Sequence, residues 1–235
     1  MQVKNILYNN GQPWDKKVVV ICLVTAVSLT MNKYLPGCLS VVHFSGNEQL
    51  SSLADWVLIL FIFYFVLPVA VIKILFRENL SDYGLKLQGA FKEYWIYLAM
   101  LAVMIPVIGF FSTTASFQAK YPFYDLKAGE KMYPYFWIWE LLYLIQFFAL
   151  EFFFRGFMTH GLKHRFGIYS VFVMTIPYCM IHFGKPFPET IAAIIAGVVL
   201  GILSLKTRSI LLGVCIHSSV GLMMDLFALW QKRIP

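Results

Sequence analysis

Long apolar segments run almost end to end through the 235 residues of this chain. Hydrophobic residues make up 60% of the sequence and charged residues only 13%, and the mean hydropathy is +0.71. A soluble domain has about 45–50% apolar and about 25% charged residues. In lipid, a spanning segment of this kind satisfies its backbone polar groups by forming a helix. The sequence therefore predicts an all-α, multi-pass transmembrane bundle of about seven to eight helices.

The expected spans are the apolar runs between polar loops. Pro68 and Pro177 each lie inside one of these runs, where a proline can kink a helix. The two runs that flank residues 184–188 are short for a span, so seven spans, eight elements or one re-entrant helix all fit the sequence. The expected spans cover residues 18–31, 53–76, 94–111, 134–158, 168–183, 189–205 and 209–230.

Charged residues between the spans give the expected topology. The net charge of +7 comes from cations between apolar runs, where they anchor loops, so nucleic acid is not an expected partner. A modest Lys/Arg bias predicts a cytoplasmic N-terminus. The cell membrane is the expected location because the sequence shows no other targeting signal. We expect one integrated domain, with helices and loops in residues 1–133 and core helices in 134–230. The basic segment 159–167 is expected to be a short link with His160 and His164 solvated at the interface.

Few ionisable residues lie inside the apolar segments, and most of these lie toward the C-terminus. An ionisable group in lipid costs several kcal/mol unless it is paired or faces a wet cavity. Because random tolerance would scatter such residues, their clustering favours a buried polar site. They include Glu140, Glu151, Arg155, His182, His217 and Asp225.

Glu151 and Arg155 are four residues apart, so they lie on one helix face about one turn apart. A structural ion pair and half of an active site both fit this spacing. His182 alone is typical of a hydrogen-bonded interfacial residue, whereas His217, in mid-helix, needs a partner or water. Glu151 could act as a general base while the imidazoles orient water, or the three could bind a divalent metal. Asp225 either joins this site or faces the outer interface.

Three stretches in this region form a recognisable set of motifs: Leu150-Glu151-(x3)-Arg155-Gly156, Tyr178-(x3)-His182 and His217-(x3)-Gly221. The set resembles the signatures of the CPBP family of intramembrane proteases, also called the Abi or CAAX-protease-like family. Those signatures are Glu-Glu-x-x-x-Arg, Phe-x-x-x-His and His-x-x-x-Asn/Asp. The resemblance covers roughly residues 134–230.

The resemblance implies an intramembrane metalloprotease that hydrolyses a peptide bond of a membrane-associated or lipidated peptide. Its partners would be that substrate and membrane lipids. It implies catalytic roles for Glu151, Arg155, His182 and His217, and a divalent metal, expected to be Zn²⁺, on Glu151, His182 and His217. A metal-free site that activates water fits these residues equally well. Tyr178 and Asp225 would have auxiliary roles.

Two positions depart from the family pattern. Leu150 stands where the family carries the acid assigned to activate water, and Gly221 stands where it carries Asn or Asp. These departures support an alternative, a catalytically weak or inactive protease-like scaffold that binds a peptide or a lipidated tail. A small transporter with a Glu–Arg–His proton relay is a third hypothesis. It ranks last, because the sequence contains no repeated pair of broken helices.

Overall fold

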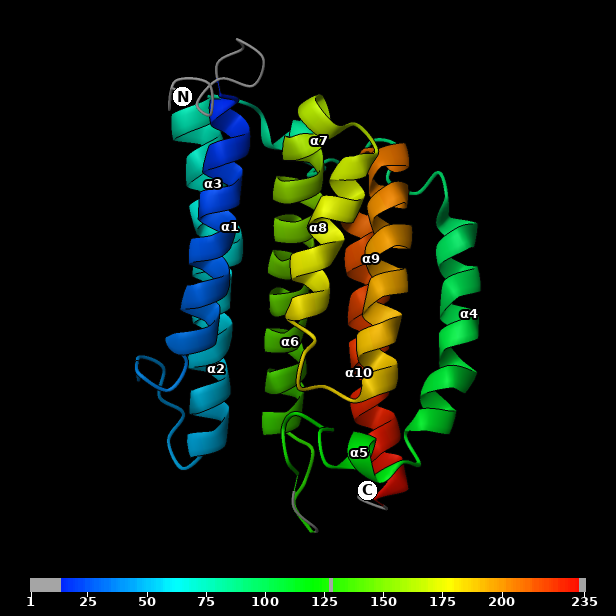
Figure 1. The fold of residues 1–235 in the computed structure, drawn as a ribbon. Coiled ribbons are helices and arrows are strands. Elements are labelled where there is room, and N and C mark those ends of the chain that lie inside the picture. The colour runs from blue at the N-terminus through cyan, green and yellow to red at the C-terminus, as the bar shows by residue number, and fades with distance from the viewer. Residues whose placement is uncertain (1–13, 127–128, 233–235) are drawn as a thin grey trace, which may run out of the picture.

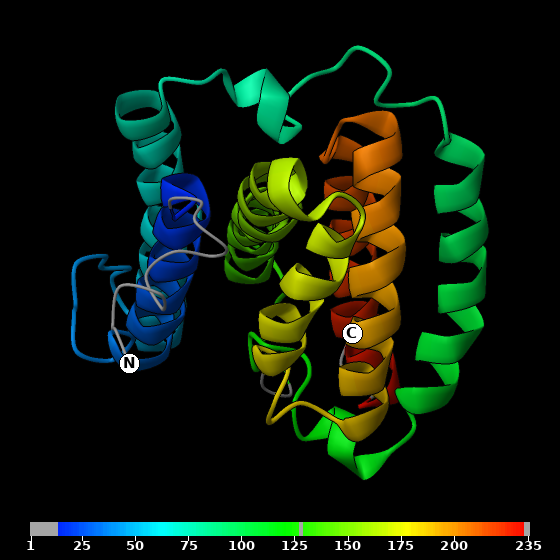
Figure 2. The same ribbon diagram turned by 45° about the horizontal axis from the view of Figure 1, so that its top comes forward.

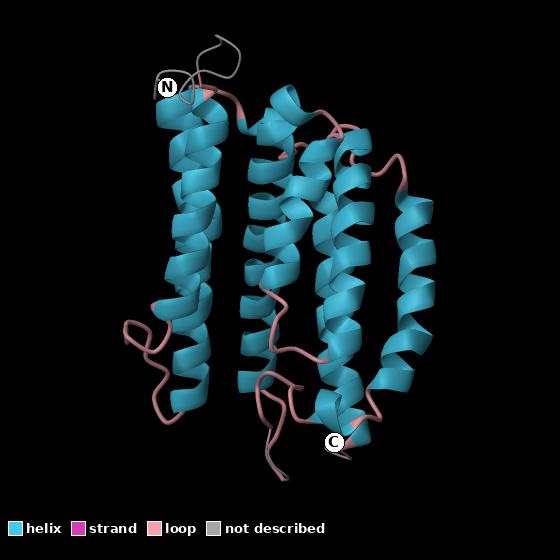
Figure 3. Ribbon diagram, in the orientation of Figure 1, coloured by secondary structure: helices cyan, strands magenta, loops and turns pink. Residues whose placement is uncertain are grey.

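The computed structural model describes residues 14–126 and 129–232, and its regular structure in these ranges is helical (Figure 3). The all-α class predicted from the sequence is confirmed. Within the described ranges, six helices are long and apolar enough to cross a membrane. The chain is therefore described below as a multi-pass membrane protein.

The six candidate spans include two long helices that each combine α-helical and π-helical parts. One is the continuous helix Glu48–Phe76, and the other is the continuous helix Tyr135–Phe166. The elements are α1 (Lys16–Tyr34), α2 (Glu48–Phe61), a π-helical stretch (Ile62–Val66), α3 (Leu67–Ala70), a second π-helical stretch (Val71–Phe76), a 3₁₀ turn (Leu80–Tyr83), α4 (Tyr94–Phe111), α5 (Ala115–Gln118), α6 (Tyr135–Glu151), a third π-helical stretch (Phe152–His160), α7 (Gly161–Phe166), α8 (Tyr169–Met180), α9 (Phe187–Thr207) and α10 (Leu211–Gln231).

Polar side chains fix where the first two helices begin. The carboxylate of Asp15 accepts hydrogen bonds from the backbone N–H groups of Lys17 and Val18, at 3.0 and 3.2 Å. The side-chain oxygen of Asn47 accepts one from the backbone N–H of Leu50 at 2.9 Å. Both are N-caps, which satisfy N–H groups that have no partner within the helix.

Pro68 lies inside a helix that continues on both sides of it. Proline lacks an N–H donor, and its ring collides with the carbonyl one turn earlier in a regular α-helix. The π-helical stretch Ile62–Val66 directly precedes it and widens the helix there. The expected span across this proline is thus present.

The helix Tyr135–Phe166 occupies the centre of the bundle (Figures 1 and 2). Its most apolar window is 72% buried, against 11% for α4 at the edge. α2 packs against α6 on one side, α8 packs against α9 on the other, and α10 contacts both α6 and α4. The main apolar core surrounds the aromatic run Phe152–Phe154 of the central helix. Glu151 and Arg155 therefore lie in the most enclosed part of the molecule.

Two expectations about the C-terminal half were wrong. The segment 159–167 is not a loop, because the central helix continues through it to Phe166. The segment 168–183 is not a full span, because α8 has only 12 residues. Figure 1 shows α8 ending about half way along the bundle, where a loop leads down to α9. This short helix and its loop bring His182 to the middle of the bundle.

His160 and His164 differ in their surroundings, although both were expected to be solvated. His160 is only 4% exposed, and its Nε2 lies 3.0 Å from the hydroxyl of Ser204. Ser204 lies on α9, which is distant in sequence, and so the burial of His160 could not be foreseen. His164 is partly exposed, as expected, and its Nε2 lies 2.7 Å from Asp15.

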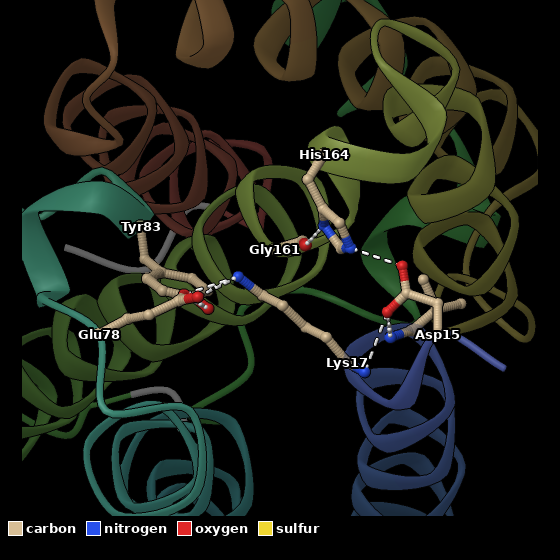
Figure 4. A network of polar contacts seen from close by, with 7 residues as sticks. Asp15, Lys17, Glu78, Tyr83, Gly161 and His164 are labelled. Carbon is tan, nitrogen blue, oxygen red and sulfur yellow. Dashed lines mark hydrogen bonds and ion pairs between the residues drawn. The ribbon is translucent and has the colours of Figure 1, made fainter. Parts of the chain in front are cut away.

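A polar network joins three elements at the end of the bundle near the start of α1 (Figure 4). Lys17 pairs with Glu78, which also accepts a hydrogen bond from the hydroxyl of Tyr83. His164 presents its two ring nitrogens to Asp15 and to the carbonyl of Gly161. Both partners are hydrogen-bond acceptors. The network ties α1 to α7 and to the 3₁₀ turn.

Candidate active site

Glu151 lies at the end of α6 and is fully buried. Its Oε1 is 3.0 Å from NH1 of Arg155, one turn further along, and 2.9 Å from Nδ1 of His217 on α10. The structure thus brings an acid, a guanidinium and an imidazole together. The spacing of the first two residues predicted their pairing, whereas the contact with His217 joins two helices.

A close approach of α10 makes the contact between Glu151 and His217 possible. Gly213 lies one turn before His217, and a Cβ atom at this position would be 2.8 Å from Oε2 of Glu151. Any larger residue would therefore displace the carboxylate or the helix. Gly213 has a positional role that the sequence motifs did not indicate.

Arg155 is held from two directions. Its Cζ lies 3.9 Å above the centroid of the Tyr178 ring, in addition to the ion pair with Glu151. A cation over an aromatic face is attracted by the ring quadrupole, most strongly where water is excluded. Tyr178 occupies the motif position that is Phe in the resembling family, and its ring performs this packing role.

His217 projects from α10 against the aromatic ring of Phe147, with ring centroids 4.4 Å apart. Its Nδ1 faces a carboxylate, which only accepts hydrogen bonds, so this nitrogen is the donor. In a neutral imidazole the other nitrogen, Nε2, is then the acceptor. His217 is therefore oriented with a basic nitrogen on the side away from Glu151.

His182 follows α8 in the loop that leads to α9. Its Nδ1 lies 2.8 Å from the backbone carbonyl of Tyr178, so Nδ1 is the donor and Nε2 is again left as the acceptor. The hydroxyl of Thr190 on α9 donates to the backbone carbonyl of His182 at 3.0 Å. Both ends of the loop are thereby fixed around this imidazole.

A cavity of about 250 Å³ lies between α4, α9 and α10. Both imidazoles line it, together with Tyr178, and the side chains contributed by α4 are apolar. Among the described residues that line it, neither Glu151 nor Arg155 is present. His217 therefore separates the Glu151–Arg155 ion pair from the cavity.

Asp225 also lies outside the lining of this cavity, among the residues described. Its carboxylate accepts hydrogen bonds from the backbone N–H of Phe123 and from the indole N–H of Trp139, both at 3.2 Å. It is fully buried, and Glu140 is hydrogen-bonded to it. These contacts anchor the loop before α6, and α6 itself, to α10, and the auxiliary role expected for Asp225 stays a prediction.

Gly221 packs directly against the ring of Phe147. A Cβ atom at position 221 would overlap this ring and would lie 3.2 Å from the ring of Tyr143. An aromatic wall thus occupies the space where an Asn or Asp side chain would lie. Leu150, the other departure from the family pattern, is buried in the apolar core.

The expected metal ligands Glu151, His182 and His217 do not form a compact ligand set. Within residues 14–126 and 129–232, no three His, Cys, Asp or Glu side chains lie close enough together to hold a metal ion. Oε1 of Glu151 is already shared by Arg155 and His217. The side chains of the described residues, as arranged, do not fit a three-ligand centre. Bound Zn²⁺ stays a prediction, tested by the metal content of the protein and of His182→Ala.

Sequence reasoning missed three polar residues that line the cavity, Tyr121, Lys185 and Glu189. Glu189 lies in the first turn of α9, where an acid suits the positive end of the helix dipole, so its position in the sequence does not indicate a cavity residue. Lys185 lies in a short turn, and Tyr121 lies in a loop about 60 residues before it in the chain, so no local pattern connects them.

The fold and the site define a multi-pass helical membrane protein with a carboxylate–imidazole pair beside a cavity. Residues 132–223 match the family model described as "Type II CAAX prenyl endopeptidase Rce1-like". This segment contains all three motifs, so the resemblance to the CAAX-protease-like family is confirmed over it. Comparisons with curated proteins and with solved structures found no match.

Proposed function

We propose that this chain is an intramembrane peptidase that hydrolyses a peptide bond of a membrane-associated or lipidated peptide. The family match over residues 132–223 supports a CAAX-protease-like peptidase. One observation carries the proposal: His217 lines a cavity while its Nδ1 is bound by a fully buried carboxylate, that of Glu151. A carboxylate that orients an imidazole in this way is a recurring device for making a general base.

In this proposal His217 is the general base, and Glu151 acts through it. This assignment revises the role expected for Glu151, because Glu151 is not among the described residues that line the cavity. Arg155 keeps Glu151 ionised, and the carboxylate stabilises the imidazolium that forms when Nε2 accepts a proton. Glu151 and Arg155 are positioning residues, whereas His217 touches the reacting water.

Hydrolysis then proceeds in two steps. Water adds to the carbonyl carbon of the peptide bond while its proton passes to Nε2 of His217, and the carbonyl oxygen becomes an oxyanion. When the carbon–nitrogen bond breaks, the same proton passes to the departing amine. His182, with an acceptor Nε2 at the same cavity, orients the attacking water. The products are a carboxylic acid and an amine.

We further propose that the end of the bundle near the start of α1 faces the cytoplasm, in the cell membrane. The loops at that end are rich in Lys and Arg, which favours retention on the cytoplasmic side. Lys86 and Lys206 belong to this set, and so do the cations of the polar network in Figure 4.

Hydrolysis of a fluorogenic lipidated peptide by the protein in lipid nanodiscs tests the proposed function. His217→Ala and His182→Ala should each remove the activity and leave helix content and melting temperature close to those of the unmodified protein. His43→Ala, at an exposed histidine outside the cavity, is the matched control. Unchanged hydrolysis by His217→Ala would remove the proposed base.

A second function, a scaffold without catalysis, has its own support. Leu150 is buried in the apolar core, and Phe147 fills the space beside Gly221. Such a protein would bind a peptide or lipidated tail in the cavity and release it uncleaved. A comparison of Leu150→Glu with Leu150→Gln, whose neutral side chain has nearly the same shape as that of Glu, separates the two functions. A large gain of activity in Leu150→Glu alone would mean that the natural chain is a binding protein.

A further inference from the structure

Lys185, Glu189 and Tyr121 form a polar cluster on the cavity wall. Nζ of Lys185 lies 2.7 Å from Oε1 of Glu189 and 3.1 Å from the hydroxyl of Tyr121. That hydroxyl donates to the carboxylate of Glu189, with both oxygens at 2.8 Å. The Nζ atom also lies over the rings of Tyr121 and Phe123, at 5.7 and 5.5 Å from their centroids. The ammonium is therefore fixed in one place.

Lys185 has one more N–H donor than it has partners in the described part of this cluster. Glu189 is engaged on both of its oxygens, by Tyr121 and Lys185. An ammonium has three N–H donors, and partners in the described part of the chain take two of them. The cluster thus retains one N–H donor of Lys185, and Glu189 supplies a counter-charge to it beside apolar walls.

The surroundings strengthen the attraction of this donor for an anion. Among the described residues that line the cavity, Lys185 is the one with a cationic side chain and Glu189 the one with a carboxylate. Most of the remaining lining is apolar, so a charge pair formed there is less weakened by water than at the surface. His182 and His217 line the same cavity, and so a ligand of Lys185 would lie in the space that the imidazoles also face.

From this cluster we infer that Lys185 is the binding site for a carboxylate carried by the peptide in the cavity. The inference rests on the proposed function only in assuming that a peptide enters the cavity. The carboxylate has two possible sources, the C-terminus of the peptide or an Asp or Glu side chain within it. A bond between an ammonium and a carboxylate is charge-assisted, which predicts a preference of about tenfold over a neutral amide.

The test measures binding and does not depend on turnover. The probe is a palmitoylated, fluorescein-labelled penta-alanine peptide, made with a free C-terminal carboxylate and with a C-terminal carboxamide. Its affinity is measured by fluorescence anisotropy for the protein and for His217→Ala in lipid nanodiscs. The free acid should bind about tenfold more tightly than the amide, and Lys185→Met should remove this difference while Lys185→Arg retains it.

Lys206→Met is the matched control, because Lys206 also pairs with a glutamate, Glu93, but outside the cavity lining that the described residues form. It should leave the preference for the acid intact. A merely structural role of Lys185 would weaken the binding of both probes equally. A third probe, the carboxamide with one internal glutamate, identifies the source: binding like the free acid assigns a side-chain carboxylate, and binding like the plain amide assigns the C-terminus.

Equal affinity for the free acid and the amide in protein that retains Lys185, or no binding of either form, overturns the inference. Failure of the proposed function gives a different result. In that case no hydrolysis is detected, but the unmodified protein still binds the free acid more tightly than the amide, and the Lys185→Met variant does not. The chain is then a carboxylate-binding scaffold.

Discussion

Nδ1 of His217 lies 2.9 Å from Oε1 of Glu151, and this contact joins α10 to the central helix of the bundle. Arg155 approaches the same oxygen at 3.0 Å. One carboxylate oxygen of Glu151 therefore contacts both the guanidinium of Arg155 and the imidazole of His217, in a buried part of the bundle.

Glu151→Gln should lower kcat for hydrolysis by at least about 100-fold, because a neutral amide stabilises the imidazolium of His217 less than a carboxylate does. KM should change little, since Glu151 is not among the described residues that line the cavity. Steady-state kinetics on the lipidated peptide checks this. Glu93→Gln, which removes the surface partner of Lys206, is the control. An unchanged kcat would show that His217 does not depend on the carboxylate.

Removing one member of the Glu151–Arg155 pair should destabilise the protein more than removing both. Each single variant, Glu151→Leu or Arg155→Met, leaves an uncompensated buried charge, which costs about 3–5 kcal/mol. The double variant leaves none, and its free energy of unfolding should recover much of that loss. Denaturant unfolding in mixed micelles gives the four values of the cycle. Additive losses in the double variant would contradict the pairing.

Gly213→Ala should disturb the site although Gly213 carries no side chain. The added Cβ would be 2.8 Å from Oε2 of Glu151, so the carboxylate must move away from His217. We expect kcat to fall about tenfold and stability to drop by about 1–3 kcal/mol. Gly109→Ala is the control, because the nearest atom to its Cβ would be the ring of Phe227 at 3.5 Å. Equal behaviour of the two variants would refute this account.

The polar network of Figure 4 should make stability sensitive to acid. Burial raises the pKa of Asp15, but the hydrogen bonds from His164 and from the backbone of Val18 outweigh it, so the pKa of Asp15 lies below its ordinary 3.8. Burial likewise raises the pKa of Glu78, but Lys17 and Tyr83 bring it below the ordinary 4.5. Depressed carboxyl pKa values contribute stability above the unfolded-state values, and this is lost as pH falls through the folded-state values.

The melting temperature measured from pH 7 down to pH 3 checks this dependence. The decrease below about pH 4.5 should be smaller in a variant with Asp15→Asn and Glu78→Gln than in the unmodified protein. Glu48→Gln, at an exposed position, is the control. Parallel curves for the unmodified protein and the double variant would rule out a contribution from the network.

Much of the fold could be predicted because membrane helices are encoded by composition over a whole segment. The predicted span 94–111 agrees with α4, and the predicted span 189–205 lies within α9. The wrong predictions concern two segments whose composition is typical of a different structure from the one they form. Segment 159–167 has the polar composition of a loop, yet it continues the central helix, and its α7 part packs against α1 and α8. Segment 168–183 has the composition of a span, yet the helix stops at Met180.

The candidate site was predictable in part for a similar reason. Spacing along one helix indicates the pairing of Glu151 with Arg155, because residues four apart share a face. Spacing does not indicate which side of His217 faces the carboxylate or that Glu151 lies behind the cavity wall. It also does not reveal Lys185, Glu189 and Tyr121, whose contacts join α9 to a loop before α6. Such relationships depend on the packing of whole helices.

The packing of Phe147 against Gly221 has a consequence for substitutions at position 221. Because the ring occupies the volume of a side chain at position 221, an Asn or Asp could be accommodated there only after Phe147 had become smaller. The two positions must therefore change in a fixed order. A single Gly221→Asn or Gly221→Asp substitution would therefore meet a steric barrier, which the same substitution beside a smaller residue at position 147 would avoid.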